Sequence, residues 1–133
     1  MKFFFDRNMS KYLATMMAIY ERTATVVHLD DDGRFIPTTP DVEWIRILAA
    51  DETPWIILSG DARILRNRVE RGVLEEAKLT FFCMGRTWSH MDVNEYAWKF
   101  LKIWPSILEK ASSPTKRIYE VSGTKVDVVS SFR

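Results

Sequence analysis

Three aspartates stand where the chain turns between regular segments, and their carboxylates together can hold a metal ion. Asp6 follows the apolar run FFF, Asp61 follows WIILSG, and Asp41 begins a segment with helical spacing. Two carboxylates about 4 Å apart repel each other by roughly 4 kcal/mol in a surface-like dielectric, and a divalent cation removes that repulsion. Because oxygen-only ligands favour hard cations, we expect Mg²⁺ or Mn²⁺ as the cofactor.

Local structure offers a simpler explanation for two of these acids. The dipole of a helix that begins at Asp41 favours a carboxylate there by about 0.3–1 kcal/mol, without any metal. Asp61 can equally serve as the N-cap of a helix. Neither explanation applies to Asp6, which follows three phenylalanines and precedes the next cap, Ser10, by four residues. Asp6 is therefore the most informative of the three.

The segments that must position these acids alternate between strand-like and helix-like patterns. Apolar runs predict strands at 3–5, 24–29, 55–59 and 79–84. Helical spacing predicts helices after Ser10, from Asp41 with Thr39 as its cap and Pro40 in its first turn, at about 61–77, and from Val93 onward, where Pro105 kinks or splits the helix.

This alternation is typical of an α/β protein with a parallel sheet covered by helices on both faces. We expect a three-layer α/β/α fold with a mainly parallel central sheet of four to five strands. Ligands of such sheets bind beyond the carboxyl ends of the strands, and Asp6 and Asp61 stand at two of those ends. The two acids can therefore share one crevice.

The C-terminal segment has a different pattern. The runs RIYEV and KVDVV flank the residues Ser122, Gly123 and Thr124, which predicts a β-hairpin. This hairpin either extends the edge of the sheet or acts as a docking arm. We expect a main domain at 1–111 and a tail at 112–133.

Composition limits the classes of function. The chain has 133 residues, 47% of them hydrophobic and 28% charged, as in an ordinary globular protein. Its net charge of +1 provides no global field for nucleic acid, so any such attraction needs a local patch. The single cysteine, Cys83, has no partner for an intramolecular disulfide. The apolar run at MKFFF is too short for a signal peptide or a membrane span. We expect a soluble, cytoplasmic protein with no membrane partner.

Three segments in order, FFFDRNMS, TPDVEWI and WIILSGDARIL, resemble the PIN-like domain family, which includes VapC-type toxin ribonucleases. The resemblance covers roughly residues 2–85 and is closest to a short branch of the family. It implies that Asp6, Asp41 and Asp61 bind the metal and that Asn8 and Ser59 orient a carboxylate or a metal-bound water. Ser59 stands where threonine is usual, which keeps the hydroxyl.

The sequence departs from larger PIN domains in one respect. Those domains carry a fourth acidic residue, and none is found after the fourth predicted strand, where the sequence reads CMGRTWSH. With three carboxylates, one firmly held metal is expected, and a second would arrive only with the substrate.

The function that the resemblance implies is metal-dependent hydrolysis of RNA, leaving a 5′-phosphate and a 3′-hydroxyl. As the toxin of a toxin–antitoxin pair, such a protein would bind a small antitoxin and self-associate into a dimer. A non-catalytic PIN-like module that binds RNA or protein is the alternative. A phosphoacceptor receiver domain and an Asp-x-Asp phosphatase fit less well, because Asn8 stands where each of them needs an acid.

Arginines follow the third acid and can bind RNA phosphates through their forked guanidinium groups. The candidates are Arg63, Arg66, Arg68, Arg71 and, after the fourth strand, Arg86. An ordinary solvated helix face, balanced by Glu70, Glu75 and Glu76, explains the same cluster equally well.

Some other polar and aromatic residues have open readings. Trp88 either stacks on an unpaired base or fills the core. The run of three aspartates at 30–32 is a solvated turn or a lid that contributes a carboxylate. Neither His28 nor His90 has a cysteine or histidine at ligand spacing, so a zinc site is not expected.

Overall fold

Strands and helices alternate along the chain, as the sequence predicts, in a computed structural model that describes residues 1–115 and 118–129. The strands are β1 (Lys2–Phe5), β2 (Thr25–His28), β3 (Trp55–Ser59), β4 (Thr80–Met84), β5 (Ile118–Val121) and β6 (Val126–Val128). The α-helices are α1 (Lys11–Tyr20), α2 (Asp41–Ala49), α3 (Arg63–Arg66), α4 (Arg68–Ala77) and α5 (Val93–Ala111). Two 3₁₀ turns, η1 (Leu29–Asp31) and η2 (Arg86–His90), follow β2 and β4.

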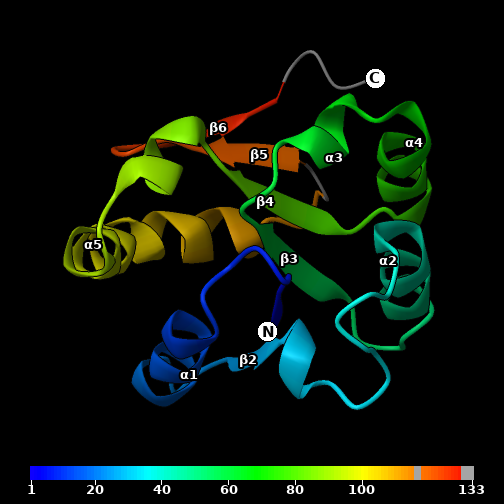
Figure 1. Cartoon of the computed structure of the whole chain (residues 1–133), viewed down its shortest axis with the longest axis horizontal. Helices are drawn as coiled ribbons and strands as arrows, with labels where there is room; N and C mark the ends of the chain where they lie inside the picture. Colours follow the sequence, from blue (N-terminus) through cyan, green and yellow to red (C-terminus); the bar gives the residue numbers. More distant parts are fainter. Residues whose placement is uncertain (116–117, 130–133) are drawn as a thin grey trace.

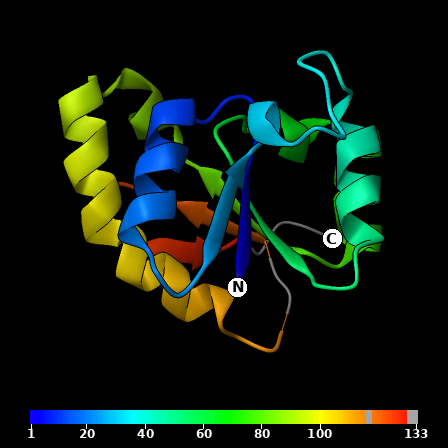
Figure 2. The same cartoon turned by 90° about the horizontal axis from the view of Figure 1, so that it is seen from below.

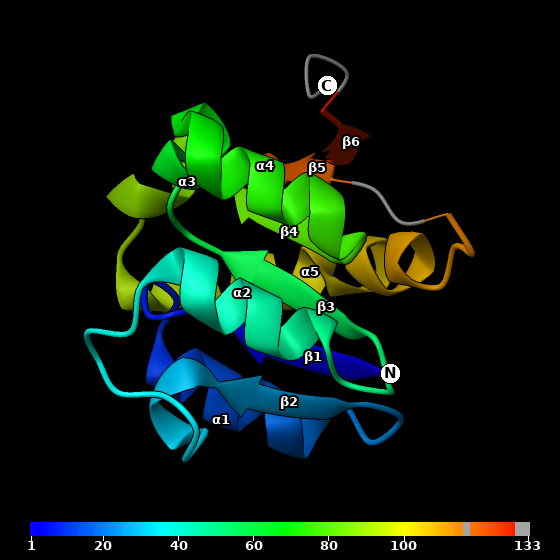
Figure 3. The same cartoon turned by 90° about the vertical axis from the view of Figure 1, so that its right-hand side faces the viewer.

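The six strands form one sheet in the order β2-β1-β3-β4-β5-β6 (Figure 3). All neighbouring pairs are parallel except β5 and β6, which run antiparallel. Helices α1 and α5 cover one face, and α2, α3 and α4 cover the other (Figures 1 and 2). The expected three-layer α/β/α fold with a mainly parallel sheet is confirmed.

Alternation along β1 shows why the sheet is covered on both faces. Phe3 and Phe5 pack into the core under α1 and α5, while Phe4 packs into the core under α2 and α4, and all three are fully buried. A strand that is apolar on both sides cannot face water on either, so helices must lie over both. The first residue after this strand is Asp6, which places a carboxylate at the end of an interior strand of the sheet.

Two helix boundaries differ from the prediction. The helix expected at about 61–77 is two helices, because the Asn67 side chain accepts hydrogen bonds from the N–H groups of Val69 and Glu70 and starts α4 anew. The N-cap of α2 is Pro40 and not Thr39, whose hydroxyl accepts the N–H of Ile36 instead. Pro105 does not split α5, which continues from Val93 to Ala111.

The predicted C-terminal hairpin is confirmed as β5 and β6. It extends the sheet edge, because β5 pairs with β4 and its residues Tyr119 and Val121 are buried in the core. Parts of the tail expected at 112–133, namely 116–117 and 130–133, lie outside the described residues. The domain boundary and the docking-arm role stay predictions.

The helices of the described residues bear on the question of a membrane span. None of their helices has the length and apolar character that crossing a membrane requires.

Candidate active site

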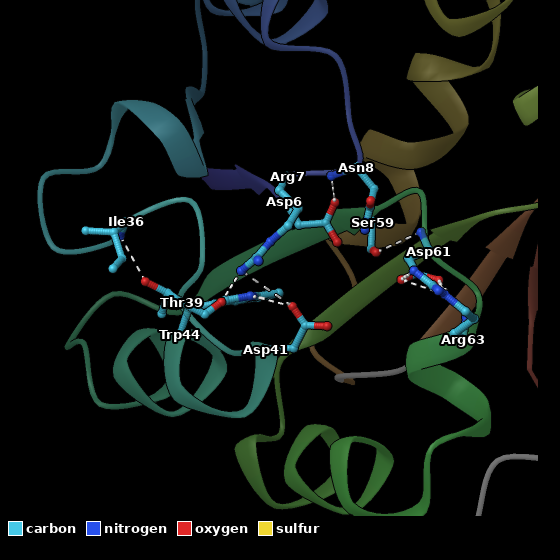
Figure 4. Close-up of polar contacts among 10 residues, drawn as sticks. All are labelled: Asp6, Arg7, Asn8, Ile36, Thr39, Asp41, Trp44, Ser59, Asp61 and Arg63. Atoms are coloured by element: carbon cyan, nitrogen blue, oxygen red, sulfur yellow. Dashed lines mark hydrogen bonds and ion pairs between the residues drawn. The ribbon is translucent and has the colours of Figure 1, made fainter.

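The sheet topology brings two of the three acids to one edge. Asp6 follows β1 and Asp61 follows β3, and these strands are parallel neighbours with Phe5 paired to Leu58. The N–H of Asp6 donates to the carbonyl of Leu58 at 3.0 Å, which continues the strand pairing by one residue. Asp41, the first residue of α2, lies at the same edge of the sheet (Figure 4).

Asp6 is a buried carboxylate with only 2% of its surface exposed. It accepts the backbone N–H of Asn8 at 2.9 Å. Burial raises the pKa of Asp6 to about 6, helped by the negative charge of Asp41 and opposed by hydrogen bonds from Ser59, Asn8 and Gly60. The chain therefore holds a group at this edge that is difficult to ionise without a nearby cation.

Ser59 links two of the acids. Its fully buried hydroxyl bonds to the Asp6 carboxylate and also accepts the backbone N–H of Asp61 at 3.1 Å. Asn8 contacts Asp6 through its backbone N–H. The structure thus places both predicted neighbours beside Asp6, one through its side chain and one through its main chain.

Asp41 is held by a tryptophan and an arginine. The fully buried Trp44 donates its indole N–H to Oδ1 of Asp41 at 2.9 Å. Nη2 of Arg7 lies 3.9 Å from the same oxygen and also donates to the carbonyl of Thr39. The sequence reading missed Arg7, because a basic residue directly after an acidic one carries no distinctive signal.

Glu70 is the fourth acid at this edge, and sequence reasoning missed it. Its pKa is raised to about 7 by burial first, then by a hydrogen bond to Asp41 and by the negative charges of Asp41 and Asp61. Glu70 and Asp41 therefore form an acid pair, joined by this hydrogen bond. The available signal was Asn67 followed three residues later by Glu70, the spacing of a helix start.

Asp61 faces a different direction from the other acids. Both of its carboxylate oxygens accept from the Arg63 side chain, with Oδ1 to Nε and Oδ2 to Nη2 at 2.9 Å each. Its Oδ1 also accepts the N–H of Arg63, the first residue of α3, at 2.9 Å. The Arg63 hydrogen bonds lower the pKa of Asp61. Figure 4 shows the Asp61 carboxylate turned toward Arg63.

The donor set suits a hard cation in its chemistry, but its present conformation does not form a metal cage. Asp41 lies within electrostatic range of Asp6 and Glu70, Asp61 lies within range of Glu70, and the pKa values of Asp6 and Glu70 are raised. Among the described residues, however, no group of three or more His, Cys, Asp or Glu side chains is close enough to hold an ion. The carboxylate of Asp61, for its part, is already occupied by a guanidinium.

The predicted RNA-binding arginines do not all lie together. Arg63 and Arg66 are exposed on α3, and the charge of Arg66 reaches Asp61. Arg68 is exposed at the start of α4, and Arg86 is exposed at the start of η2 after β4. The first two arginines are the ones placed beside the acids.

Other residues are explained by packing or by local pairing. Trp88 is buried, with its indole N–H donating to the carbonyl of Val121 at 3.0 Å, so the base-stacking interpretation is wrong. Nε2 of His28 bonds to the carbonyl of Met9, and its Nδ1 accepts the N–H of Asp30, which leaves neither nitrogen for a metal. Within the 30–32 run, Asp31 forms an ion pair with Lys11, and Asp32 forms one with Arg34.

The first two thirds of the chain match a known protein family. A family model described as PIN like domain matches residues 1–86 of the 133. The chain belongs to the PIN-like domain family. No curated protein and no solved structure matches it significantly. The matched part of this PIN-like domain contains Asp6, Asp41, Asp61 and Glu70, whereas α5 and the β5–β6 hairpin lie beyond it. PIN-like domains are often nucleases, and the acidic edge is compatible with that activity.

The raised pKa values of Asp6 and Glu70 predict a stability that falls as the pH rises in the metal-free PIN-like domain. The folded-state pKa of Asp6, about 6, exceeds its ordinary value of 3.8, so its protonated form favours folding. This contribution is complete below about pH 4 and is lost as the pH rises to about 6, which amounts to about 3 kcal/mol. Glu70, raised from 4.5 to about 7, extends the fall toward neutral pH.

The measurement is urea unfolding in EDTA between pH 4 and 8. The ion-paired aspartates Asp32, Asp51 and Asp61 have lowered pKa values, so their contribution to stability is complete above about pH 5 and is lost only at lower pH. They therefore do not mask the fall. As controls, Asp6→Asn flattens the lower part of the curve and Glu70→Gln the upper part. An unfolding free energy that stays constant from pH 5 to 7 would contradict the placement of both acids.

Proposed function

We propose that this PIN-like domain is a Mg²⁺- or Mn²⁺-dependent endoribonuclease that hydrolyses RNA phosphodiester bonds. The observation that carries the proposal is Asp6, a buried carboxylate at the carboxyl edge of the sheet, beside the Asp41–Glu70 acid pair. Among the described residues, Asp6 has no ion pair with a basic side chain. A fold does not keep an unpaired buried acid for stability, because the charge costs folding free energy.

The residues that would hold the ion are Asp6, Asp41 and Asp61, with Glu70 at hydrogen-bonding distance from Asp41. A bound Mg²⁺ or Mn²⁺ supplies an activated water and neutralises charge on the phosphoryl oxygens. Ser59 keeps the carboxylate of Asp6 oriented and fixes the backbone of Asp61. The buried indole of Trp44 does the same for Asp41, so two of the acids are held by rigid parts of the fold.

The RNA would bind across the same edge. Arg63 and Arg66 on α3 stand next to the acids, and Arg68 on α4 and Arg86 after β4 are the further candidates for contact with phosphates. Guanidinium groups bind phosphates without reading the bases, so these contacts would position the strand and would weaken as salt increases.

A toxin role in the cytoplasm, with a small antitoxin as protein partner and a homodimer as the assembly, completes the proposal. An apolar groove of about 240 Å³ between α1 and α5, lined by Leu13, Met16 and Tyr96 among others, supports a protein partner. Expression of the chain alone should arrest growth of the host, and co-expression of a small protein encoded next to it should restore growth.

A non-catalytic module that binds RNA is the second candidate. It is favoured by the contacts of Asp61, whose carboxylate is occupied by Arg63. Such a module would bind RNA equally well with and without a divalent ion.

The deciding experiment is incubation of single-stranded RNA with the protein in three parallel arms, containing Mg²⁺, Mn²⁺ or EDTA. We expect cleavage in the two metal arms, loss of cleavage in EDTA, and products with a 5′-phosphate and a 3′-hydroxyl. Calorimetric titration with Mn²⁺ measures metal binding independently. RNA binding without cleavage in every arm would instead establish the non-catalytic module.

A further inference from the structure

We infer that Arg63 is an internal counter-cation that occupies Asp61 and must leave it before Asp61 can become a ligand of a divalent ion. The inference rests on the proposed function, because it concerns the same acidic edge. It goes further by assigning to one residue the control of metal affinity.

The contacts between the two side chains are those of a complete fork. Nε of Arg63 lies 2.9 Å from Oδ1 and 3.2 Å from Oδ2 of Asp61, and Nη2 lies 2.9 Å from Oδ2. Both carboxylate oxygens are therefore used, and the oxygen lone pairs that an ion would need are directed toward the guanidinium. The charge that a metal would neutralise is already neutralised.

Asp61 differs in this respect from the other two predicted ligands. Asp6 takes hydrogen bonds from neutral groups, and Asp41 meets Arg7 only at 3.9 Å. Arg7 approaches only one oxygen of the Asp41 carboxylate, and at this distance it does not block the other oxygen. Arg7 is also tied to the carbonyl of Thr39, which fixes it in place. The ligand set is thus incomplete at one carboxylate.

The exposure of the two side chains allows Arg63 to move away from Asp61. The Arg63 side chain is 80% exposed, whereas that of Asp61 is only 17% exposed, so the guanidinium can swing into water while the acid stays. Exposed ion pairs are weakly held, because water and salt replace them at little cost. Arg63 also lies at the start of α3, a helix of only four residues. A divalent ion that binds Asp6 and Asp41 would attract the Asp61 carboxylate more strongly than a single positive charge does.

The test is calorimetric titration of Mn²⁺ into the full chain and two variants at fixed pH and salt. We expect Arg63→Gln to bind Mn²⁺ about three- to fivefold more tightly than the unchanged protein, since it removes the competing cation. Arg68→Gln is the matched control, with the same change of net charge on a neighbouring exposed residue. Its affinity should change less than about twofold, because Arg68 is exposed and has no ion pair with any of the proposed ligands among the described residues, so solvent and salt screen its charge.

A second readout follows the arginine itself in the unchanged protein. The Nε–H resonance of Arg63, assigned by its loss in Arg63→Gln, should shift as diamagnetic Mg²⁺ is added, while other arginine Nε–H resonances change less. A structural role of the ion pair alone would leave this resonance where it is.

The outcomes separate this inference from the proposed function. Tighter Mn²⁺ binding by Arg63→Gln without RNA cleavage by any form of the protein supports the inference and rejects the nuclease. Metal-dependent cleavage together with equal Mn²⁺ affinities of Arg63→Gln and Arg68→Gln overturns the inference and keeps the nuclease. Absence of Mn²⁺ binding by both the unchanged protein and Arg63→Gln overturns the inference as well.

Discussion

Asp6→Asn is expected to abolish RNA cleavage and to make the protein more stable at the same time. Loss of this carboxylate removes the most deeply buried of the proposed metal ligands. Removal of outer partners alone typically lowers metal affinity or activity 10–100-fold, so loss of a ligand should reduce cleavage at least about a hundredfold. The measurement is the initial rate of RNA cleavage in Mg²⁺ or Mn²⁺.

The gain in stability has a separate physical reason. At pH 7.5 the wild-type carboxylate, with a pKa of about 6, is ionised in a buried position, and that ionisation opposes folding. The amide of Asn at position 6 still accepts the N–H of Asn8 and carries no charge. The free energy of unfolding of Asp6→Asn should therefore be roughly 1–3 kcal/mol higher than that of the wild type at this pH. The gain should nearly disappear at pH 4, where the folded wild-type acid is protonated and the unfolded one, with its ordinary pKa of 3.8, is about half ionised.

Asp127→Asn provides the control, because Asp127 is exposed on β6, away from the acidic edge. It should leave both cleavage and stability nearly unchanged. Cleavage at the wild-type rate by Asp6→Asn would reject the proposed active site. A loss of stability at pH 7.5 would show instead that Asp6 is a structural residue.

Gly60→Val is expected to lower the rate of RNA cleavage about a hundredfold, although it changes no acidic residue. A Cβ at position 60 would lie 3.0 Å from the carbonyl oxygen and 3.4 Å from the carbonyl carbon of Asn8, both main-chain atoms that cannot rotate away. The loops that carry Asp6 and Asp61 must then move apart. A displacement of about 1 Å at a catalytic site can lower the rate about 10²-fold, because positioning supplies much of the acceleration.

The matched control is Gly33→Val, made in a loop where an added Cβ meets nothing within 4 Å. Neither glycine has a positive φ angle, so the two substitutions differ in the space around them and not in backbone strain. Cleavage rates and urea unfolding of both variants give the comparison. Equal rates for Gly60→Val and Gly33→Val would mean that the close approach of the two loops is unimportant for activity.

These predictions share one feature of the fold, the concentration of negative charge at a single edge of the sheet. Asp6 and the Asp41–Glu70 pair destabilise the metal-free protein, and the two flanking arginines, Arg7 and Arg63, relieve part of that charge. Active sites commonly retain residues that lower the stability of the protein, because the activity requires them.

Local patterns in the sequence determined the elements that build this edge. The three phenylalanines at 3–5 are all removed from water only in a strand that is buried on both faces, and the run at 55–59 is of the same kind. Once two such strands are parallel neighbours, the residues that follow them, Asp6 and Asp61, must lie at the same end. The layers of the fold and the meeting place of these acids were therefore predictable.

Only the tertiary structure decided how the charges at that edge are paired. Glu70 faces Asp41 because Asn67 interrupts the predicted helix and begins α4 there, and helix pattern alone does not fix such a break. The turn of Asp61 toward Arg63 is likewise a choice between side-chain conformations. Apolar periodicity specifies burial, which extends over whole elements, whereas charge pairing depends on the positions of a few side-chain atoms brought together from separate elements.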